Sequence, residues 1–439
     1  MPDPADLGLR EAAAAVADGD VSAEGLFAAC RARAEAHAEL GAFVALGEPA
    51  EAAPGPLHGV PVSVKDLVDV AGMPTRGGSA ATAEAAAAAD ATIVADLRRT
   101  GAVVLGKTAT HELAYGVTTR AAVNPWARDR LVGGSSGGAA VAVAIGAGPL
   151  ALGSDTAGSC RIPAALCGVA GMMARPGRLP LDGVIGLAPG LDALGFLTRT
   201  AADLAFAWTA LTGEAVQPPR APRVGIAPET ALGAVDPAAR AAAEDAARLL
   251  AKPAVLDVPA FDDWSRPRGT VIGALALEQH RRRGWWPAHA EIYDAAIAYD
   301  LRAAERTGAG ALLAARGRLD ELARRLRDAI AGVDVLVLPT TPRAAPRRED
   351  GGDLARADRR HAAQLTRFCG PVNAAGLAAV TVLGGLDADG LPLGVQLVAR
   401  DEPTALAAAA LYEDRAGAPP RPPLVAGAAA GNDRTREHT

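Results

Sequence analysis

Residues Gly133 to Gly168 read GGSSGGAAVAVAIGAGPLALGSDTAGSCRIPAALCG, and this stretch decides the fold. Two serines, Ser135 and Ser159, each lie in a glycine-rich bend, and an apolar segment separates the two bends. Glycine permits backbone conformations closed to other residues and lets a substrate approach the main chain. A serine in such a bend offers a hydroxyl beside unpaired N–H groups, as an acyl-transfer nucleophile with an oxyanion hole requires. Two flexible loops are the alternative interpretation, but both serines together with a nearby lysine favour a hydrolase site.

That lysine, Lys65, lies near the end of LHGVPVSVKDLVDV (Leu57 to Val70), which alternates in the manner of a strand. A lysine at a strand end is usually solvated. If it is buried near a helix N-terminus, however, its pKa falls and the neutral amine can accept a proton. A serine hydroxyl needs such a base to attack an amide at neutral pH, and few histidines of this chain are well placed for that role.

Composition narrows the class of protein. The chain has 439 residues, is 50% hydrophobic and carries a net charge of −6, which suits one large α/β domain or two ordinary ones. The mild acidity and the lack of a basic stripe argue against nucleic-acid binding. The longest apolar run, residues 139–153, is broken by glycine and proline and is too short to span a membrane.

Cysteine usage and the N-terminus predict a cytoplasmic location. The four cysteines form neither CxxC pairs nor a zinc-ligand spacing, and we interpret them as reduced, mostly buried thiols: Cys30, Cys160, Cys167 and Cys369. The first twenty residues carry acids and lack the basic-then-apolar order of a signal peptide.

Periodicity along the chain predicts helices alternating with strands. Residues 7–46 are typical of helical hairpins with Ser22 as an N-cap, residues 90–100 of a helix, 101–108 of a buried strand, and the segment after Gly137 of a helix. This order predicts a parallel or mixed sheet with helices on its faces. Charge-rich helices over 214–330 predict a solvated outer layer that shapes a pocket mouth. Residues 333–342 predict a strand, and residues 377–399 predict two strands joined by a tight turn.

Three motifs together resemble the amidase signature family: GVPVSVKD (Gly59 to Asp66), GGSSGG (Gly133 to Gly138) and DTAGSCRIPAALCG (Asp155 to Gly168). The resemblance implies a single large α/β domain with a central mixed β-sheet covered by helices on both faces. It implies an amidase domain over 1–414, with a signature core over about 57–205, a variable helical region over about 214–330 and C-terminal strands over about 333–400. Residues 415–439 are expected to form a disordered tail.

The resemblance also implies the role of each site residue. Ser159 would be the nucleophile, Lys65 the base, and Ser135, preceded by a cis peptide bond, the proton shuttle between them. The N–H groups of the loop would hold the oxyanion, and Asp155 and Arg161 would form a structural ion pair that braces it; the loop donors are Thr156, Ala157, Gly158 and Ser159. The expected enzyme is a serine amidohydrolase of a small-molecule amide that needs no metal, nucleotide or flavin. Homodimers are common among such relatives.

Departures from the family pattern bear on the substrate. Ala157 stands where glycine is usual, and the resulting DTAGS resembles allophanate hydrolases, which indicates a urea or carbamoyl-type substrate as one alternative. An alanine there would be strained if the position required a positive φ. The segments GMMARPGR (Gly171 to Arg178) and APGLD (Ala188 to Asp192) also depart from the pattern, and we expect both on the substrate side.

Two further functions stay open. The chain also resembles the glutaminase subunit of tRNA-dependent amidotransferases, which releases ammonia within a complex. GSSGG (Gly134 to Gly138) also fits the nucleophile elbow of α/β-hydrolases, with Ser136 as nucleophile and His289 or His361 as base. That interpretation leaves the motif from Asp155 onward unexplained.

The pocket is expected from the loops near residues 111–126, 184–196, 270–310 and 361–376. Either an apolar wall or ordinary packing would explain its aromatic residues, which are Trp126, Trp285, Trp286 and Tyr293. Three consecutive arginines, Arg281 to Arg283, would either recognise a carboxylate or end a solvated helix.

Overall fold

Short apolar runs separated by helices build one mixed sheet. The computed structural model describes residues 3–82, 84–217, 221–349 and 353–425. Within these residues eleven strands form a single sheet in the order β1-β3-β2-β4-β6-β5-β10-β11-β9-β7-β8. The strands are β1 (Phe43–Leu46), β2 (Pro61–Lys65), β3 (Val103–Thr108), β4 (Leu150–Asp155), β5 (Ala170–Met173), β6 (Ala193–Thr198), β7 (Val224–Ile226), β8 (Ala254–Val255), β9 (Val335–Pro339), β10 (Ala378–Leu386) and β11 (Pro392–Ala399).

Strand direction brings two motifs to one edge of the sheet. β2 runs parallel to both β3 and β4, whereas β4 pairs with β6 in the antiparallel sense. The carboxyl ends of neighbouring parallel strands lie at the same edge, where open α/β sheets bind their ligands. Lys65 ends β2 and Asp155 ends β4, so the lysine motif and the second serine motif meet there.

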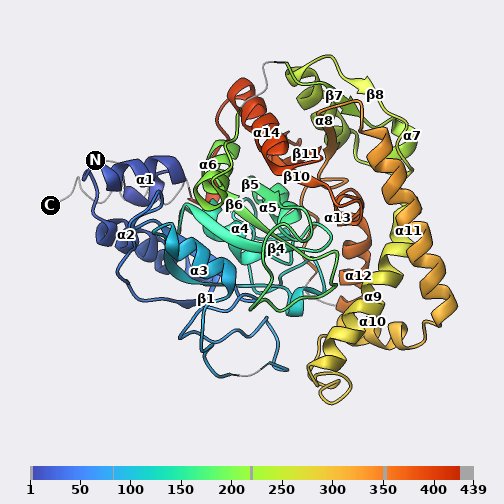
Figure 1. The fold of residues 1–439 in the computed structure, drawn as a ribbon, viewed down its shortest axis with the longest axis horizontal. Helices are drawn as coiled ribbons and strands as arrows, with labels where there is room; N and C mark the ends of the chain where they lie inside the picture. The colour runs from blue at the N-terminus through green and yellow to red at the C-terminus, as the bar shows by residue number, and fades with distance from the viewer. Residues whose placement is uncertain (1–2, 83, 218–220, 350–352, 426–439) are drawn as a thin grey trace.

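Helices cover both faces of the sheet (Figure 1), as the sequence predicts. The α-helices are α1 (Leu9–Ala17), α2 (Ala23–Ala36), α3 (Thr92–Arg99), α4 (Gly137–Ala144), α5 (Arg161–Cys167), α6 (Ala201–Thr212), α7 (Glu229–Leu232), α8 (Pro237–Leu250), α9 (Ser265–Arg282), α10 (Ala295–Glu305), α11 (Ala309–Ala329), α12 (Leu354–Leu365), α13 (Gly370–Ala374) and α14 (Glu402–Ala416). Short 3-10 helices lie at η1 (Pro4–Asp6), η2 (Ala38–Leu40), η3 (Glu112–Ala114) and η4 (Phe261–Trp264).

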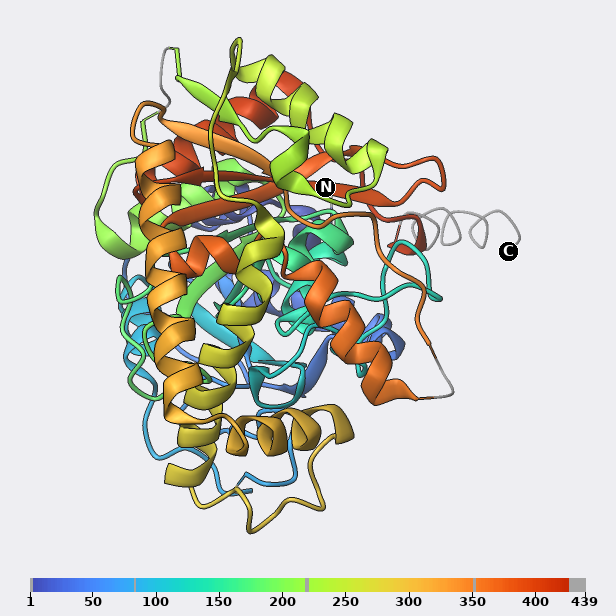
Figure 2. The same ribbon diagram turned by 90° about the vertical axis from the view of Figure 1, so that its right-hand side faces the viewer.

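The core has two sides because alternate strand residues point to opposite faces. In β9, Val335 and Val337 join a cluster that includes residues of α6, α8 and α14, whereas Leu336 and Leu338 join a cluster with residues of α9 and α11. The long helices α9 and α11 pack side by side and form an outer layer, drawn in yellow and orange in Figure 2.

The N-terminal prediction is confirmed in part. Ser22 caps α2 by accepting a hydrogen bond from the N–H of Gly25 at 3.0 Å. The predicted helical hairpins do not extend to residue 46, however, because Phe43–Leu46 form β1, an edge strand antiparallel to β3. A four-residue edge strand gives too short a pattern to separate from the end of a helical segment.

The region 214–330 also differs from its prediction. It contributes β7 and β8 to the sheet, and α8 packs directly on β9 and β11. The buried face of α8 consists of five alanines and one leucine at helical spacing, namely Ala239, Ala242, Ala243, Ala246, Ala247 and Leu250. Only the rest of this region, α9 to α11, forms the predicted outer layer.

The chain after α14 returns to the N-terminal region. Arg421 forms an ion pair with Asp6, and the N–H of Leu424 donates to the carbonyl of Pro125 at 3.4 Å. Residues 426–439 of the expected disordered tail lie outside the described residues. Among the helices described, none is both long enough and apolar enough to cross a bilayer.

Candidate active site

Lys65 is fully buried at the end of β2 and contacts two serines. Its Nζ donates to Ser135 Oγ at 2.7 Å and to Ser154 Oγ at 2.9 Å. Within the described chain no carboxylate forms an ion pair with it, and burial lowers the pKa of its ammonium group to about 8. Desolvation disfavours the charged form of a lysine, so about a tenth of Lys65 is a neutral amine at pH 7, a fraction far above that of an exposed lysine.

The first glycine loop aims Ser135 at this lysine. The peptide bond between Gly134 and Ser135 is cis, as the family resemblance implies. The carbonyl of Ser135 accepts the N–H of His111 at 3.0 Å and the hydroxyl of Thr119 at 3.2 Å. A Cβ on Gly134 would lie 2.6 Å from Thr119 Oγ1, so only glycine fits there. α4 begins directly after this loop.

The second loop places Ser159 beside the first. It leaves β4 after Asp155 and enters α5 at Arg161. The N–H of Ser136 donates to the carbonyl of Ser159 at 3.0 Å, which joins the two serine loops through their backbones. Ser159 is 5% exposed and lines a cavity, whereas Ser135 lies completely buried behind it.

Backbone N–H groups of this loop differ in their availability. The N–H of Gly158, an expected oxyanion donor, instead donates to Asp155 Oδ1 at 2.7 Å. Within the residues that the structure describes, the N–H groups of Thr156, Ala157 and Ser159 have no hydrogen-bond partner. These three remain available to a ligand, and Gly158 serves the loop geometry through its φ of +121°.

Ala157 fits its position without strain. Outside glycine, positive φ values in the described chain occur only at Leu113, Ala114 and Thr119. Ala157 therefore has an ordinary negative φ. The strain that an alanine would suffer at a position requiring positive φ does not arise here.

A buried ion pair supports the loop that carries Ser159. Arg161 donates from Nη2 to Asp155 Oδ1 at 2.9 Å, and both side chains are completely buried. Burial alone would raise the pKa of Asp155, but the guanidinium and the surrounding hydrogen bonds hold it below its ordinary value. Asn373 and Gln396 accept further hydrogen bonds from Arg161 at 2.6 and 3.0 Å. This is the structural ion pair expected from the resemblance.

Asp192 supports the other side of the loop. Its carboxylate accepts the Thr156 hydroxyl at 2.6 Å and the N–H groups of Leu187 and Ala188 at 2.9 and 2.8 Å. Burial raises the pKa of this carboxyl. The APGLD segment therefore reaches the Ser159 loop through Asp192, and Leu187, the residue just before the segment, lines the cavity.

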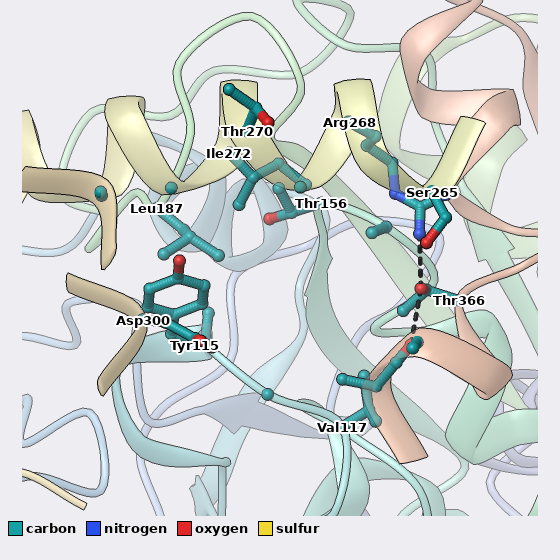
Figure 3. A pocket seen from close by; sticks show the side chains of 18 of the residues that line it. Tyr115, Val117, Thr156, Leu187, Ser265, Arg268, Thr270, Ile272, Asp300 and Thr366 are labelled. Atoms are coloured by element: carbon teal, nitrogen blue, oxygen red, sulfur yellow. Dashed lines mark hydrogen bonds between the residues drawn. The ribbon is translucent and has the colours of Figure 1, made fainter. Parts of the chain in front are cut away.

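The cavity in front of Ser159 has a volume of about 420 Å³. Its walls come from the loop after η3, the Ser159 loop, α9, α10 and the end of α12 (Figure 3). Each of the four segments that the sequence predicts for the pocket contributes at least one lining residue, and the Ser159 loop and the start of α9 add others from outside those segments. The polar lining includes Tyr115, Thr156, Arg268, Asp300 and Thr366.

The aromatic residues proposed as a wall do not line this cavity. Trp126 packs against Gly168, and its Nε1 donates to the carbonyl of Cys167 at 2.8 Å. Trp286 and Tyr293 pack edge to face within the core. Ordinary packing is thus the correct interpretation of these side chains, because each finds its partners within the fold.

The arginine run ends a solvated helix. Arg281 pairs with Glu305 at 2.7 Å, and Arg282 pairs with Glu278 on the same helix. Arg283 lies over the ring of Trp285. None of the three lines the cavity, so the carboxylate-binding interpretation of this run is not supported.

One alternative interpretation and one expectation fail for positional reasons. Ser136 donates its hydroxyl to the carbonyl of Ser154 at 3.1 Å and does not line the cavity, which removes the basis for the nucleophile elbow. The GMMARPGR segment lies away from the cavity: it begins in β5, and Arg175 donates from Nε to Glu402 at 3.1 Å. Its departure from the family pattern therefore does not reach the substrate side.

Some site residues escaped prediction. Ser154 adjoins the predicted Asp155, and its position at a strand end was the one available signal. Asn373, Gln396 and Arg268 come from elements that are distant in sequence, and packing alone brings them to the site. No local motif marks them.

Comparison with known proteins identifies the family. The Amidase family profile matches residues 23–254 and 294–403. The 2-amino-5-chloromuconic acid deaminase of Comamonas testosteroni is 36% identical over 371 residues, covering 78% of each chain. A glutamyl-tRNA(Gln) amidotransferase subunit from Anaeromyxobacter sp. (strain K) is 33% identical over 491 aligned residues, covering 95% of this chain and 98% of that protein.

A solved structure agrees with these matches. The structure of 6-aminohexanoate cyclic dimer hydrolase complexed with substrate superposes with a TM-score of 0.85 at 28% identity and covers 96% of this chain and 100% of that one. The profile match and these relatives each span most of the chain. The chain therefore belongs to the amidase family, and it is a hydrolase of carbon–nitrogen amide bonds.

Proposed function

We propose that the enzyme is a serine amidohydrolase that works through an acyl-enzyme on Ser159, with Lys65 as base and Ser135 as proton shuttle. The observation that carries this proposal is the 2.7 Å hydrogen bond between Lys65 Nζ and Ser135 Oγ. The backbone link from Ser136 to Ser159 supports it by holding the two serine loops together. Ser159 then faces the cavity with the other two groups behind it.

In the first half-reaction Ser159 Oγ attacks the amide carbon. Its proton passes to Ser135, and the Ser135 proton passes to the neutral amine of Lys65. The carbonyl π electrons move onto oxygen, then return as the C–N bond breaks. The leaving nitrogen takes a proton from Ser135, which recovers one from Lys65, and the amine departs.

In the second half-reaction water replaces the amine. Lys65 and Ser135 take one proton from water as its oxygen attacks the acyl carbon. The bond to Ser159 Oγ breaks, and that oxygen regains a proton. One amide and one water yield one carboxylic acid and one amine, so the protein returns unchanged.

The developing oxyanion needs donors, and three unpartnered N–H groups supply them. We assign this role to Thr156, Ala157 and Ser159, and we assign Gly158 to loop geometry because its N–H is held by Asp155. Loss of one such donor typically costs about 3 kcal/mol of transition-state stabilisation. Thr156 is also fixed through its hydroxyl by Asp192.

The cavity supports a small-molecule substrate, since its volume of about 420 Å³ falls in the usual range for small ligands. A glutaminase-type subunit of an amidotransferase remains the second candidate, because that relative matches 95% of the chain. A urea or carbamoyl substrate rests on the DTAGS likeness alone.

The proposed residues all come from one chain, so a homodimer would not be needed to complete the site. The buried thiols support a cytoplasmic location.

Intact-mass measurement after treatment with a fluorophosphonate tests the proposal. We expect one adduct on Ser159 in the wild type, none in Ser159→Ala, and strongly slowed labelling in Lys65→Ala. Ser136→Ala is the matched control and should label normally. An adduct on Ser136, or unchanged labelling in Lys65→Ala, would contradict the proposed triad. Ammonia release from simple amides by the isolated chain would separate an amidase from a protein that depends on its complex.

A further inference from the structure

Arg268 is a buried arginine in the wall of the same cavity that holds Ser159. It projects from the first turn of α9 and is 5% exposed. Its Nη2 donates to Thr366 Oγ1 at 2.7 Å, the contact drawn as a dashed line in Figure 3. Its Nη1 is buried and has no hydrogen-bond partner within the described residues.

The contrast with Arg161 shows what Arg268 lacks. Both guanidinium groups are buried, but Arg161 pairs with Asp155 and is satisfied on every side. No carboxylate in the described chain forms an ion pair with Arg268. A buried charge is strongly disfavoured without a paired anion. Burial lowers the pKa of Arg268 only to about 10, so the group stays charged at neutral pH.

The main chain packs tightly against one side of the Arg268 guanidinium. The guanidinium lies against Gly370, where an added Cβ would fall 2.5 Å from Nη1. Asp300, an acidic residue of the same cavity, lies at the opposite end in Figure 3, beside Tyr115. Burial raises the pKa of Asp300 to about 6, so the two ends of the cavity differ in charge.

We propose that Arg268 is a specificity-determining residue that binds a carboxylate of the substrate, and that the enzyme acts on amides carrying such a group. This inference rests on the proposed acyl transfer at Ser159. A planar guanidinium offers several N–H donors in a geometry that matches carboxylate. A bound carboxylate would complete the ion pair that the fold leaves open, and it would hold the amide against Ser159.

Two matched pairs of substrates test the proposal. Glutaramate and valeramide differ in a carboxylate on the acyl side, and N-butyrylglycine and N-ethylbutyramide differ in one on the amine side. We expect the wild type to prefer the anionic member of at least one pair by about tenfold to a hundredfold in kcat/KM, as charged hydrogen bonds usually contribute. Arg268→Gln should remove this preference mainly through KM.

Arg281→Gln is the control, because Arg281 lies on the same helix but pairs with Glu305 outside the cavity. Its preference should match the wild type. Arg268→Lys serves as a second variant that keeps the charge and should retain part of the preference. A wild-type preference for both neutral amides, or an unchanged preference in Arg268→Gln, overturns the proposal.

Binding separates this inference from the proposed function. Calorimetry should show that glutarate binds the wild type at least tenfold more tightly than Arg268→Gln. If the fluorophosphonate adduct and all amide turnover were absent but this difference held, the acyl-transfer proposal would fail while the carboxylate site stood. If neutral amides were hydrolysed and glutarate bound both proteins equally, the carboxylate site would fail while the acyl-transfer proposal stood.

Discussion

Lys65 Nζ lies 2.7 Å from Ser135 Oγ, and 2.9 Å from Ser154 Oγ on the neighbouring strand. The lysine thus contacts one hydroxyl from each of two chain segments, both of them neutral. Lys107, the other buried lysine of this sheet, differs because Asp66 pairs with it at 3.1 Å. Burial lowers the pKa of both lysines, but Asp66 offsets part of this effect for Lys107, because a carboxylate partner favours the charged form of a lysine.

The first prediction concerns pH. Because burial lowers the pKa of Lys65 to about 8, and the neutral amine is the active form, kcat/KM should rise from pH 6, reach half its maximum near the pKa and level off above about pH 9. Lys65→Ala should lose about a hundredfold to ten-thousandfold in activity, as general bases contribute. Steady-state kinetics on a neutral amide between pH 6 and 10 measures both. Lys107→Met should lower stability but leave the midpoint of the profile in place. A flat profile would contradict the assignment of Lys65 as base.

The sequence motifs predict the residues of the site that lie within them, but not the residues that reach the site from other elements. Lys65, Ser135, Ser159 and the Asp155–Arg161 pair each belong to a contiguous motif, so residue type and spacing carried them. The role proposed for Arg268 could not be predicted, because it depends on the contact between α9 and the end of α12, which are distant in sequence.

The errors also have physical causes. Trp126 was a candidate wall residue, but its indole N–H is satisfied by Cys167 behind the site, a contact that no local pattern encodes. Strands as short as β7 and β8 carry too few residues for a periodic signal. They enter the sheet through the pairing of β7 with β9, which lies far away in the sequence. These features of the fold are therefore set by tertiary packing and could not be predicted from the periodicity of the sequence.

The second prediction concerns the thiols near the site. Burial raises the pKa of Cys160 to about 12 and that of Cys369 to about 12. Because the thiolate is the reactive form, iodoacetamide at pH 7.5 should leave the native enzyme unlabelled and fully active. Mass spectrometry should show four modified cysteines only after unfolding, which serves as the control. Loss of activity together with a native adduct at Cys160 would mean that this thiol is accessible.

The third prediction concerns the buried ion pair. Asp155→Asn leaves the Arg161 charge unpaired in the interior, which typically costs about 3–5 kcal/mol, so the urea midpoint should fall sharply. Since the pairing holds the pKa of Asp155 below its ordinary value, its contribution to stability is present above about pH 4 and is lost as pH falls through the lowered pKa. The stability difference between wild type and Asp155→Asn should therefore shrink in acid.

The ion pair between Arg130 and Asp389, whose carboxylate is exposed, provides the control. Asp389→Asn should leave the urea midpoint unchanged within error, because solvent screens such pairs. Equal losses in the two variants would show that the buried pair is no more important than a surface one.

The fourth prediction compares neighbouring positions of the oxyanion loop. Gly158 has a φ of +121°, and an added Cβ would lie 2.6 Å from Cys369 Cβ. Gly158→Ala should therefore displace the loop, lower kcat by about a hundredfold or more, as loss of an oxyanion donor does, and lower the midpoint of unfolding. Ala157 has an ordinary negative φ, so Ala157→Gly should cost at most about 1 kcal/mol in stability and leave kcat within about threefold. Kinetics and thermal unfolding of the two variants measure the difference. The opposite result, with full activity in Gly158→Ala and lost activity in Ala157→Gly, would contradict this prediction. It would mean that the unpartnered N–H groups of Thr156, Ala157 and Ser159 do not depend on the backbone geometry at Gly158. The oxyanion would then have to be assigned to other donors of the loop.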